Sequence, residues 1–278
     1  MPSHRFSQVD VFTAEPYRGN PVAVVHDADG IDDETMLRFA RWTNLSETTF
    51  LLAPTSSGAD YRLRIFTPAS ELPFAGHPTL GSCHAWLESG GMPNDPGVVI
   101  QECLSGLIRV RRSGGGELAF AEPPLLRSGP VDETMIRHVE DVLRIARGAI
   151  HDAQWVDNGP GWLAVLLESA AAVIALEPGF VDLDLGVVGP HPPGNAEAFE
   201  VRAFFPLNGA TVEDPVTGSL NASLAGWLIR SGRANAPWVA AQGTALGRAG
   251  RIHVTQDGDG TIWTGGSVVT CVRGDVDI

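Results

Sequence analysis

The sequence contains no lysine, and all 19 cationic residues of the 278-residue chain are arginines. Schiff-base enzymes, pyridoxal-phosphate enzymes and Walker-A phosphate loops need a lysine at the reacting centre, so these classes are excluded. Together with 33 acidic residues, the arginines leave a formal charge of −14. Nucleic acids and anionic membranes are bound by basic surfaces, so we expect neither as a partner.

Cysteines and long apolar runs are also scarce. Three cysteines without a CxxC spacing give neither a disulfide framework nor a zinc knuckle, and we expect no metal site because His77 and His84 have no third ligand within reach. The longest apolar stretch, residues 162–176, is too short to cross a bilayer, and residues 1–12 lack a signal-peptide pattern. These absences predict a cytoplasmic globular protein. Its 32 glycines and 20 prolines favour short strands and tight turns.

An internal duplication is the most informative pattern that is present. Arg64–Pro68 (RIFTP) recurs 138 residues later as Arg202–Pro206 (RAFFP), and His77–Ser82 (HPTLGS) recurs 137 residues later as Asp214–Ser219 (DPVTGS). A looser echo relates the GNP of residues 19–21 to the NGP of residues 158–160. Three matches in the same order, at offsets of 137 to 139 residues, predict two homologous lobes related by a pseudo-twofold axis.

Periodicity predicts the same elements in each lobe. Alternating apolar residues predict half-buried strands at 61–65 and 199–203. Helices at about 79–88 and 217–230 are apolar nearly all round, which is typical of helices buried on every side. Outer helices are expected at 32–43 and 131–147, and residues 120–130 are interpreted as a linker. We therefore predict an α+β fold with strands around one buried helix per lobe, the lobes spanning residues 1–120, completed by 266–278, and 121–265.

The two buried helices begin at glycine- and hydroxyl-rich turns. Unpaired N–H groups and the positive end of the dipole make a helix N-terminus an anion site, so the pair could hold a carboxylate without lysine. The alternative is that Thr79 and Ser219 are only helix caps. His77 and Asp214 occupy matching positions in the repeated hexapeptides, and they could converge to orient a substrate or carry a proton. The alternative for His77 is a hydrogen-bonded core histidine.

Glu47 stands at the edge of an apolar strand expected at residues 48–52. Partial burial there would raise the pKa of its carboxyl and make it a proton shuttle near neutral pH. The alternative is a solvent-facing or capping acid. The geometric prediction is that Glu47, His77, Asp214 and Ser219 line one cavity between the lobes.

Six motifs carry a family resemblance from one end of the chain to the other: residues 19–25 (GNPVAVV), 44–50 (NLSETTF), 66–81 (FTPASELPFAGHPTLG), 213–219 (EDPVTGS), 242–248 (QGTALGR) and 265–269 (GGSVV). Together they resemble the PhzF-like phenazine-biosynthesis isomerase family. The resemblance implies the diaminopimelate-epimerase-like fold, in which two lobes, each a small β-barrel around a central helix, enclose the active site.

The resemblance also implies a cofactor-free isomerase, usually a homodimer, that moves a proton on a small carboxylate-bearing ring or amino acid. By motif, Glu47 would be the general acid/base, and His77 and Asp214 would hold the substrate and assist the proton transfer. Hydrogen bonds to the substrate would come from Ser46, Gly76, Gly218, Ser219 and Gln242.

Two departures from related sequences limit the chemistry. The related amino-acid epimerases place a cysteine at each helix start, but here Ala75 precedes Gly76 and residues 214–219 contain no cysteine. Two-thiol racemisation is therefore excluded, and the remaining alternatives are an epimerase or racemase with non-thiol bases and a non-catalytic small-acid binding protein. The family's GRPS-like segment is Gly247-Arg248-Ala249-Gly250 in this chain.

Overall fold

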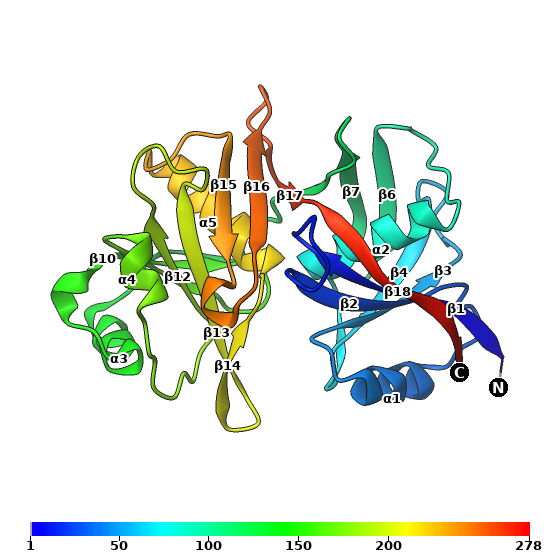
Figure 1. Ribbon diagram of the computed structural model, residues 1–278, viewed down its shortest axis with the longest axis horizontal. Coiled ribbons are helices and arrows are strands. Elements are labelled where there is room, and N and C mark those ends of the chain that lie inside the picture. The colour runs from blue at the N-terminus through cyan, green and yellow to red at the C-terminus, as the bar shows by residue number, and fades with distance from the viewer. Residues whose placement is uncertain (1) are drawn as a thin grey trace. The chain divides into compact units, whose positions relative to one another are not determined.

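The N-terminal unit comprises Met1–Ala121 and Gly265–Ile278 of a computed structural model that describes residues 2–278 (Figure 1). Met1, where the first predicted lobe begins, lies outside the described residues. The elements of this unit are β1 (Ser3–Val11), β2 (Asn20–Val25), α1 (Asp33–Thr43), β3 (Thr48–Leu52), β4 (Tyr61–Phe66), β5 (Glu71–Leu72), α2 (Gly76–Glu88), β6 (Val98–Cys103), β7 (Gly106–Arg112), β8 (Leu118–Ala121) and the C-terminal β18 (Val268–Asp277).

The second unit, Glu122–Thr264, begins with an additional strand and helix and then repeats the order of elements from β1 to β7. It contains β9 (Arg127–Pro130), α3 (Glu133–Leu143), β10 (Ile150–Asp157), β11 (Leu163–Leu167), α4 (Ala170–Ile174), β12 (Leu185–Pro190), β13 (Phe199–Leu207), β14 (Ala210–Asp214), α5 (Gly218–Arg230), β15 (Trp238–Gln242) and β16 (Gly250–Gln256). Two 3₁₀ turns are added, η1 (Arg147–Ala149) and η2 (Thr244–Leu246), and β17 (Ile262–Gly266) leads back to the first unit.

Strand pairing repeats as well. In the first unit β1–β2, β3–β4, β4–β5 and β6–β7 are antiparallel, whereas β2–β3 and β4–β6 are parallel. In the second unit β10–β11, β12–β13, β13–β14 and β15–β16 are antiparallel, whereas β11–β12 and β13–β15 are parallel. The predicted duplication is thus confirmed strand by strand.

Each unit encloses one helix, α2 or α5, as predicted. Leu80 of α2 and Leu220 of α5 are completely buried, which agrees with sequences that are apolar nearly all round. Helix α2 packs closely because Gly81 lacks a side chain: a Cβ there would lie 2.4 Å from the Val22 side chain of β2. It begins at Gly76, three residues earlier than predicted, because a proline such as Pro78 is tolerated in the first turn.

Two predictions of element boundaries and one prediction of burial need correction. Helix α3 ends at Leu143, four residues before the predicted end, because Arg144 adopts a left-handed conformation with φ of 56°. The expected linker at residues 120–130 contains the end of β8 and all of β9. Strand β13 is buried on both faces instead of one, and its Glu200 and Arg202 are 1% and 6% exposed.

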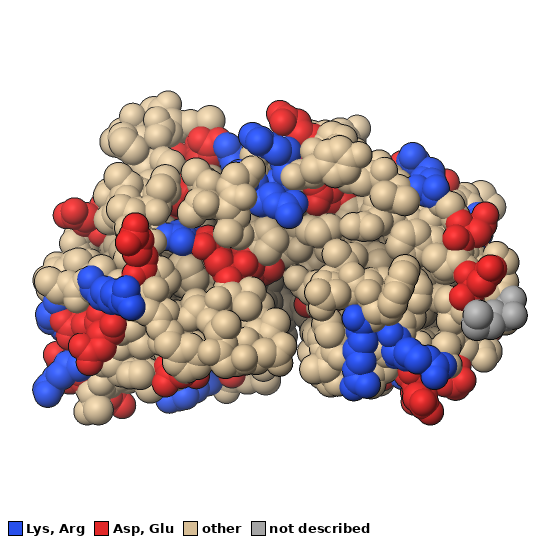
Figure 2. Space-filling view, turned by 60° about the horizontal axis from the view of Figure 1, so that its bottom comes forward, with Lys and Arg blue, Asp and Glu red and all other residues tan. Residues whose placement is uncertain are grey.

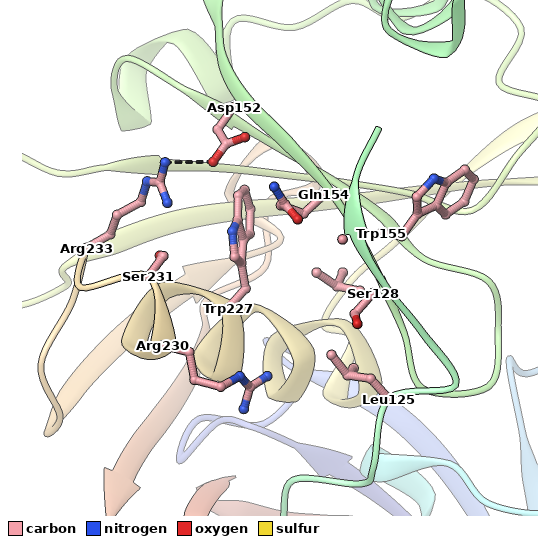
Figure 3. A pocket seen from close by; sticks show the side chains of 11 residues that line it. Leu125, Ser128, Asp152, Gln154, Trp155, Trp227, Arg230, Ser231 and Arg233 are labelled. Atoms are coloured by element: carbon pink, nitrogen blue, oxygen red, sulfur yellow. Dashed lines mark hydrogen bonds and ion pairs between the residues drawn. The ribbon is translucent and has the colours of Figure 1, made fainter. Parts of the chain in front are cut away.

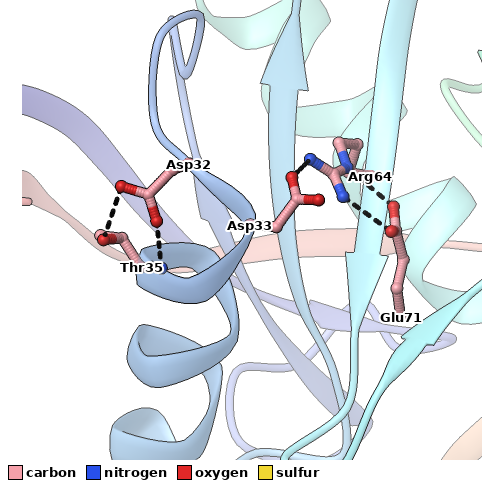
Figure 4. Close-up of polar contacts among 5 residues, drawn as sticks. All are labelled: Asp32, Asp33, Thr35, Arg64 and Glu71. Carbon is pink, nitrogen blue, oxygen red and sulfur yellow. Dashed lines mark hydrogen bonds and ion pairs between the residues drawn. The ribbon is translucent and has the colours of Figure 1, made fainter.

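The arginine of the repeated motif explains the burial of the outer face of β13. Arg202 donates through Nε and Nη2 to Glu213 at 2.9 and 2.6 Å, and its Nη1 donates at 2.7 Å to the Leu176 carbonyl beyond α4. Its counterpart Arg64 makes the same two-pronged contact with Glu71 at 2.7 Å and also bonds Asp33 of α1 at 2.5 Å (Figure 4). A repeated Arg–Glu pair therefore links β4 to β5 in the first unit and β13 to β14 in the second.

Charged side chains of both signs are interspersed on the face that Figure 2 shows, with wide uncharged areas between them. The described part of the chain, residues 2–278, holds no helix that is long and apolar enough to cross a membrane.

Candidate active site

Glu47 and His77 meet in the first unit. Glu47 directly precedes β3, after the left-handed Asn44 has ended α1, and His77 is the second residue of α2. Glu47 Oε2 lies 3.3 Å from His77 Nε2, and the two side chains are 15% and 6% exposed. The contact is close without being an aligned hydrogen bond, and such contacts often align only when a substrate is present. The alternative that Glu47 faces solvent is therefore wrong.

Burial lowers the pKa of His77 to about 3, and the neighbouring Pro21 carbonyl only partly opposes this shift. The imidazole is therefore neutral at physiological pH. Its Nδ1 lies 3.5 Å from the Asn20 amide nitrogen, whereas Nε2, on the side of Glu47, has no hydrogen-bond partner. A satisfied core histidine would have partners for both ring nitrogens. This arrangement favours a functional role over the structural alternative.

The neutral state of His77 predicts how stability depends on pH. The unfolded chain takes up the proton near pH 6.5 but the folded chain only near pH 3, so the free energy of unfolding decreases as the pH decreases. From pH 6.5 to 5 wild type should lose about 2 kcal/mol relative to His77→Asn. Urea unfolding at several pH values measures this difference, with His151→Asn, at an exposed position, as the control. Parallel profiles for wild type and His77→Asn would contradict a buried neutral imidazole.

The loop before β2 holds Asn20 beside His77. Asp10, which is 2% exposed, accepts a hydrogen bond from the Gly19 N–H at 3.0 Å. Only glycine fits at position 19, because a Cβ there would lie 2.2 Å from the Val11 carbonyl oxygen. The GNP sequence is thus a fixed turn that presents Asn20 and the Pro21 carbonyl to the imidazole.

In the second unit the turn between β14 and α5 is tied together by side chains. Asp214 accepts a 2.5 Å hydrogen bond from the Thr217 hydroxyl. Gln242 is completely buried: its Oε1 accepts from the Thr217 N–H and from Asn221, and its Nε2 donates to the Asp214 carbonyl and the Thr217 hydroxyl. Both ends of the Gln242 amide are thus used within the protein. The Gln242 side chain therefore stabilises the turn between β14 and α5.

The segment that departs from the family pattern also supports this turn. Gly247 closes η2 with φ of 70°, and Gly250 begins β16. A Cβ on Gly250 would lie 2.4 Å from the Val216 side chain, so glycine lets the turn pack against β16.

The two helix starts are equivalent, although not in the way that the repeated hexapeptides indicated. The N-cap residues are Ala75 and Thr217, and among the described residues neither helix has a side-chain cap hydrogen bond. The alternative that Thr79 and Ser219 are caps is wrong. The second residues are His77 and Ser219, so these two correspond by position in the helix. Asp214 is instead the last residue of β14, because the similar hexapeptides begin at different distances from their helices.

The remaining predicted residues lie around these two starts. Gly76 and Gly218 are the first residues of α2 and α5 and are buried, Ser219 is partly exposed, and Ser46 is exposed next to Glu47. Glu47, His77, Ser46 and Gly76 belong to the first unit, and Asp214, Gly218, Ser219 and Gln242 to the second. That the two groups line a single cavity stays a prediction.

Sequence reasoning missed two residues beside the second helix start. Asn158 donates to the Ser219 carbonyl at 2.9 Å, and the indole N–H of Trp162 donates to the Ser219 hydroxyl at 3.0 Å. Asn158 belongs to the NGP segment that the duplication matches to the GNP turn. It could have been proposed as the counterpart of Asn20, which lies beside His77. Trp162 had no comparable signal in the sequence.

Two hollows lie at the other ends of the buried helices. One, of about 290 Å³, is lined by Trp227, Arg230 and Arg233 near the end of α5 (Figure 3). Arg233 pairs with Asp152 at 2.6 Å and Arg230 with Glu122 at 2.9 Å, so both guanidinium groups already have protein partners. The other hollow, of about 330 Å³, adjoins the end of α2. Neither is lined by a predicted site residue.

Comparison with known proteins identifies the family of the chain. Residues 9–274 match the family model described as phenazine biosynthesis-like protein. The chain is 38% identical to antisense-enhancing sequence 1 of Schizosaccharomyces pombe over 99% of both chains. It is 36% identical to the trans-2,3-dihydro-3-hydroxyanthranilate isomerase of Pseudomonas aeruginosa over 92% of both.

The fold is that of a solved structure, a Bacillus anthracis phenazine biosynthesis protein of the PhzF family, with a TM-score of 0.83, 21% identity and full coverage of both chains. The predicted α+β fold and the predicted enzyme class, isomerase, are thereby confirmed. The chain therefore belongs to the phenazine biosynthesis-like family that the motifs at residues 44–50, 66–81 and 213–219 had indicated.

Proposed function

We propose that this protein is a cofactor-independent isomerase that moves a proton between two carbons of a small carboxylate-bearing substrate, with Glu47 as the acid/base. One observation carries the proposal: the Glu47 carboxylate lies 3.3 Å from the unpartnered Nε2 of a buried, neutral histidine. A proton shuttle works best beside a hydrogen-bonding neighbour and shielded from water; Glu47 has His77 at 3.3 Å and is 15% exposed, which supports this role.

In the first step Glu47 takes a proton from an acidic C–H bond, and the electron pair of that bond delocalises into the adjacent unsaturated system. In the second step the protonated Glu47 returns the proton to another carbon of that system, so that a double bond changes position and the net oxidation state does not. His77 stays neutral throughout, because its pKa is about 3, and it does not compete for the proton. It serves as a hydrogen-bonding partner to Glu47 or the substrate.

The substrate carboxylate is proposed to bind at the start of α5. Gly218 and Ser219 offer first-turn N–H groups and a hydroxyl, and a helix N-terminus attracts negative charge. Such a site suits a chain that has no lysine and a formal charge of −14. Asp214 and Gln242 keep the Thr217 turn in the shape that the helix start requires.

The function is tested with trans-2,3-dihydro-3-hydroxyanthranilate, the compound in the name of the Pseudomonas relatives. Incubation in D₂O followed by proton NMR should show a shifted double bond and deuterium at one carbon only. Inversion of a stereocentre without a double-bond shift would favour the epimerase alternative. Binding without any C–H exchange, for this compound and for a panel of small unsaturated amino acids, would favour a binding protein and contradict the proposal.

A further inference from the structure

The start of α5 holds a hydroxyl whose hydrogen-bonding direction is fixed by a neighbour. Ser219 Oγ is 3.0 Å from the indole nitrogen of Trp162. An indole N–H can only donate, so Ser219 Oγ must accept at this contact. Among residues 2–278 the Ser219 hydroxyl has no other hydrogen-bond partner. Its own hydrogen is therefore left for a group outside the protein.

Trp162 is held rigidly in this position. It is 4% exposed and directly precedes β11. The turn that leads to it is fixed by Asp157, whose Oδ1 accepts from the N–H groups of Gly159 and Gly161 at 2.7 and 2.8 Å. Asn158 of the same turn donates to the Ser219 carbonyl at 2.9 Å. Two hydrogen bonds from one turn thus fix both the backbone and the hydroxyl of Ser219.

A second observation indicates that this helix start is incomplete without a ligand. Asn221, in the first turn of α5, is 1% exposed and donates to the Thr217 carbonyl and to Gln242. Its Oδ1 has no hydrogen-bond partner within the described chain. Buried polar atoms are rarely left unsatisfied, and an amide oxygen only accepts, so a donor group of a ligand or a water held by it is expected beside this turn.

We propose that Trp162 is a positioning residue that makes Ser219 a hydrogen-bond donor to the substrate carboxylate, an inference that rests on the proposed function. With Trp162 occupying a lone pair, the O–H bond is directed away from the indole and toward an acceptor. Without it the hydroxyl rotates freely and its preference for an anion weakens. Trp162 thus selects for a carboxylate without touching it.

The test is a double-mutant cycle with Trp162→Phe, which keeps the ring and removes the N–H, and Ser219→Ala. Calorimetry with 2-aminobenzoate gives a Kd, and turnover gives kcat and KM. Trp162→Phe should raise Kd and KM about fivefold to tenfold, as expected for one hydrogen bond, and should change kcat less than twofold. In the Ser219→Ala background the same change should have no further effect, and Trp162→His, whose ring N–H can donate, should restore most of the affinity.

Equal losses from Trp162→Phe in the wild-type and Ser219→Ala backgrounds would overturn the inference, because a purely structural tryptophan acts independently of Ser219. Unchanged Kd in Trp162→Phe, or no binding of 2-aminobenzoate by wild type, would overturn it too. A failure of the proposed function is distinguishable. In that case wild type turns over no substrate, yet the dependence of 2-aminobenzoate affinity on Trp162 and Ser219 persists and supports the positioning role.

Discussion

Replacing Glu47 with glutamine is expected to lower kcat by a factor of about 10³, within the usual range for loss of a general acid/base. Glutamine keeps the size of the side chain and a hydrogen-bonding oxygen but cannot accept a proton from carbon. The 3.3 Å neighbour, His77, cannot replace it efficiently, because an imidazole with a pKa of about 3 is a very weak base. The measurement is steady-state isomerisation at pH 7.

The matched control is Glu34→Gln, which removes the same charge from an exposed position of α1 in the same unit and should leave kcat unchanged. The midpoint temperature of thermal unfolding of Glu47→Gln should be close to that of wild type, since the carboxylate lies at an end of β3 and not in a core cluster. Activity within tenfold of wild type in a folded Glu47→Gln variant would show that another group takes the proton.

The second large effect concerns stability. The duplication supplies a comparison, because the same Arg–Glu pair occurs in each unit at a different degree of burial. Arg202→Met should reduce the free energy of unfolding by about 3–5 kcal/mol, as expected when one partner of a buried ion pair is removed. The side chains of Arg202 and Glu213 are 8% and 11% exposed, and the Leu176 carbonyl would also lose its donor. Arg64→Met should cost less, about 1–2 kcal/mol, because Arg64 and Glu71 are 21% and 22% exposed and water can replace the lost contact.

Urea unfolding of both variants, with Arg38→Met on the exposed face of α1 as a neutral control, measures the difference. The double variant Arg202→Met/Glu213→Leu should recover part of the loss, because no unpaired buried charge remains. Equal decreases in the free energy of unfolding for Arg202→Met and Arg64→Met would show that burial does not decide the contribution of this repeated pair. No recovery of that free energy in the double variant would show the same.

The parts of the fold that local periodicity encodes could be predicted. The strands at β4 and β13, the all-round apolar helices α2 and α5 and the capped helix α1 follow from spacing and capping residues. Two-sided burial of β13 could not be predicted, because its outer face carries Glu200 and Arg202. Their burial depends on partners such as Glu213, which the sequence does not connect to them.

Some features of the candidate site could likewise be predicted from the sequence, and others could not. Glu47 and His77 could be named from the sequence because a family motif surrounds each. Their 3.3 Å contact depends on where β3 and α2 lie in the first unit. The equivalence of His77 with Asp214 was an accident of similar hexapeptides, because position along a helix, and not residue identity, decides which groups correspond. Trp162 escaped notice since a hydrogen bond between residues 57 positions apart leaves no local pattern.

The most direct test of a single-glutamate proton transfer follows a label through one turnover. A substrate that carries deuterium at the carbon to be deprotonated is mixed with excess enzyme in H₂O, and the product is examined by NMR and mass spectrometry. Because the Glu47 side chain is only 15% exposed, part of the deuterium should be returned to the new carbon before it exchanges with water. A product without deuterium at the new carbon, even in a single turnover, would contradict direct return of the abstracted proton by a shielded Glu47.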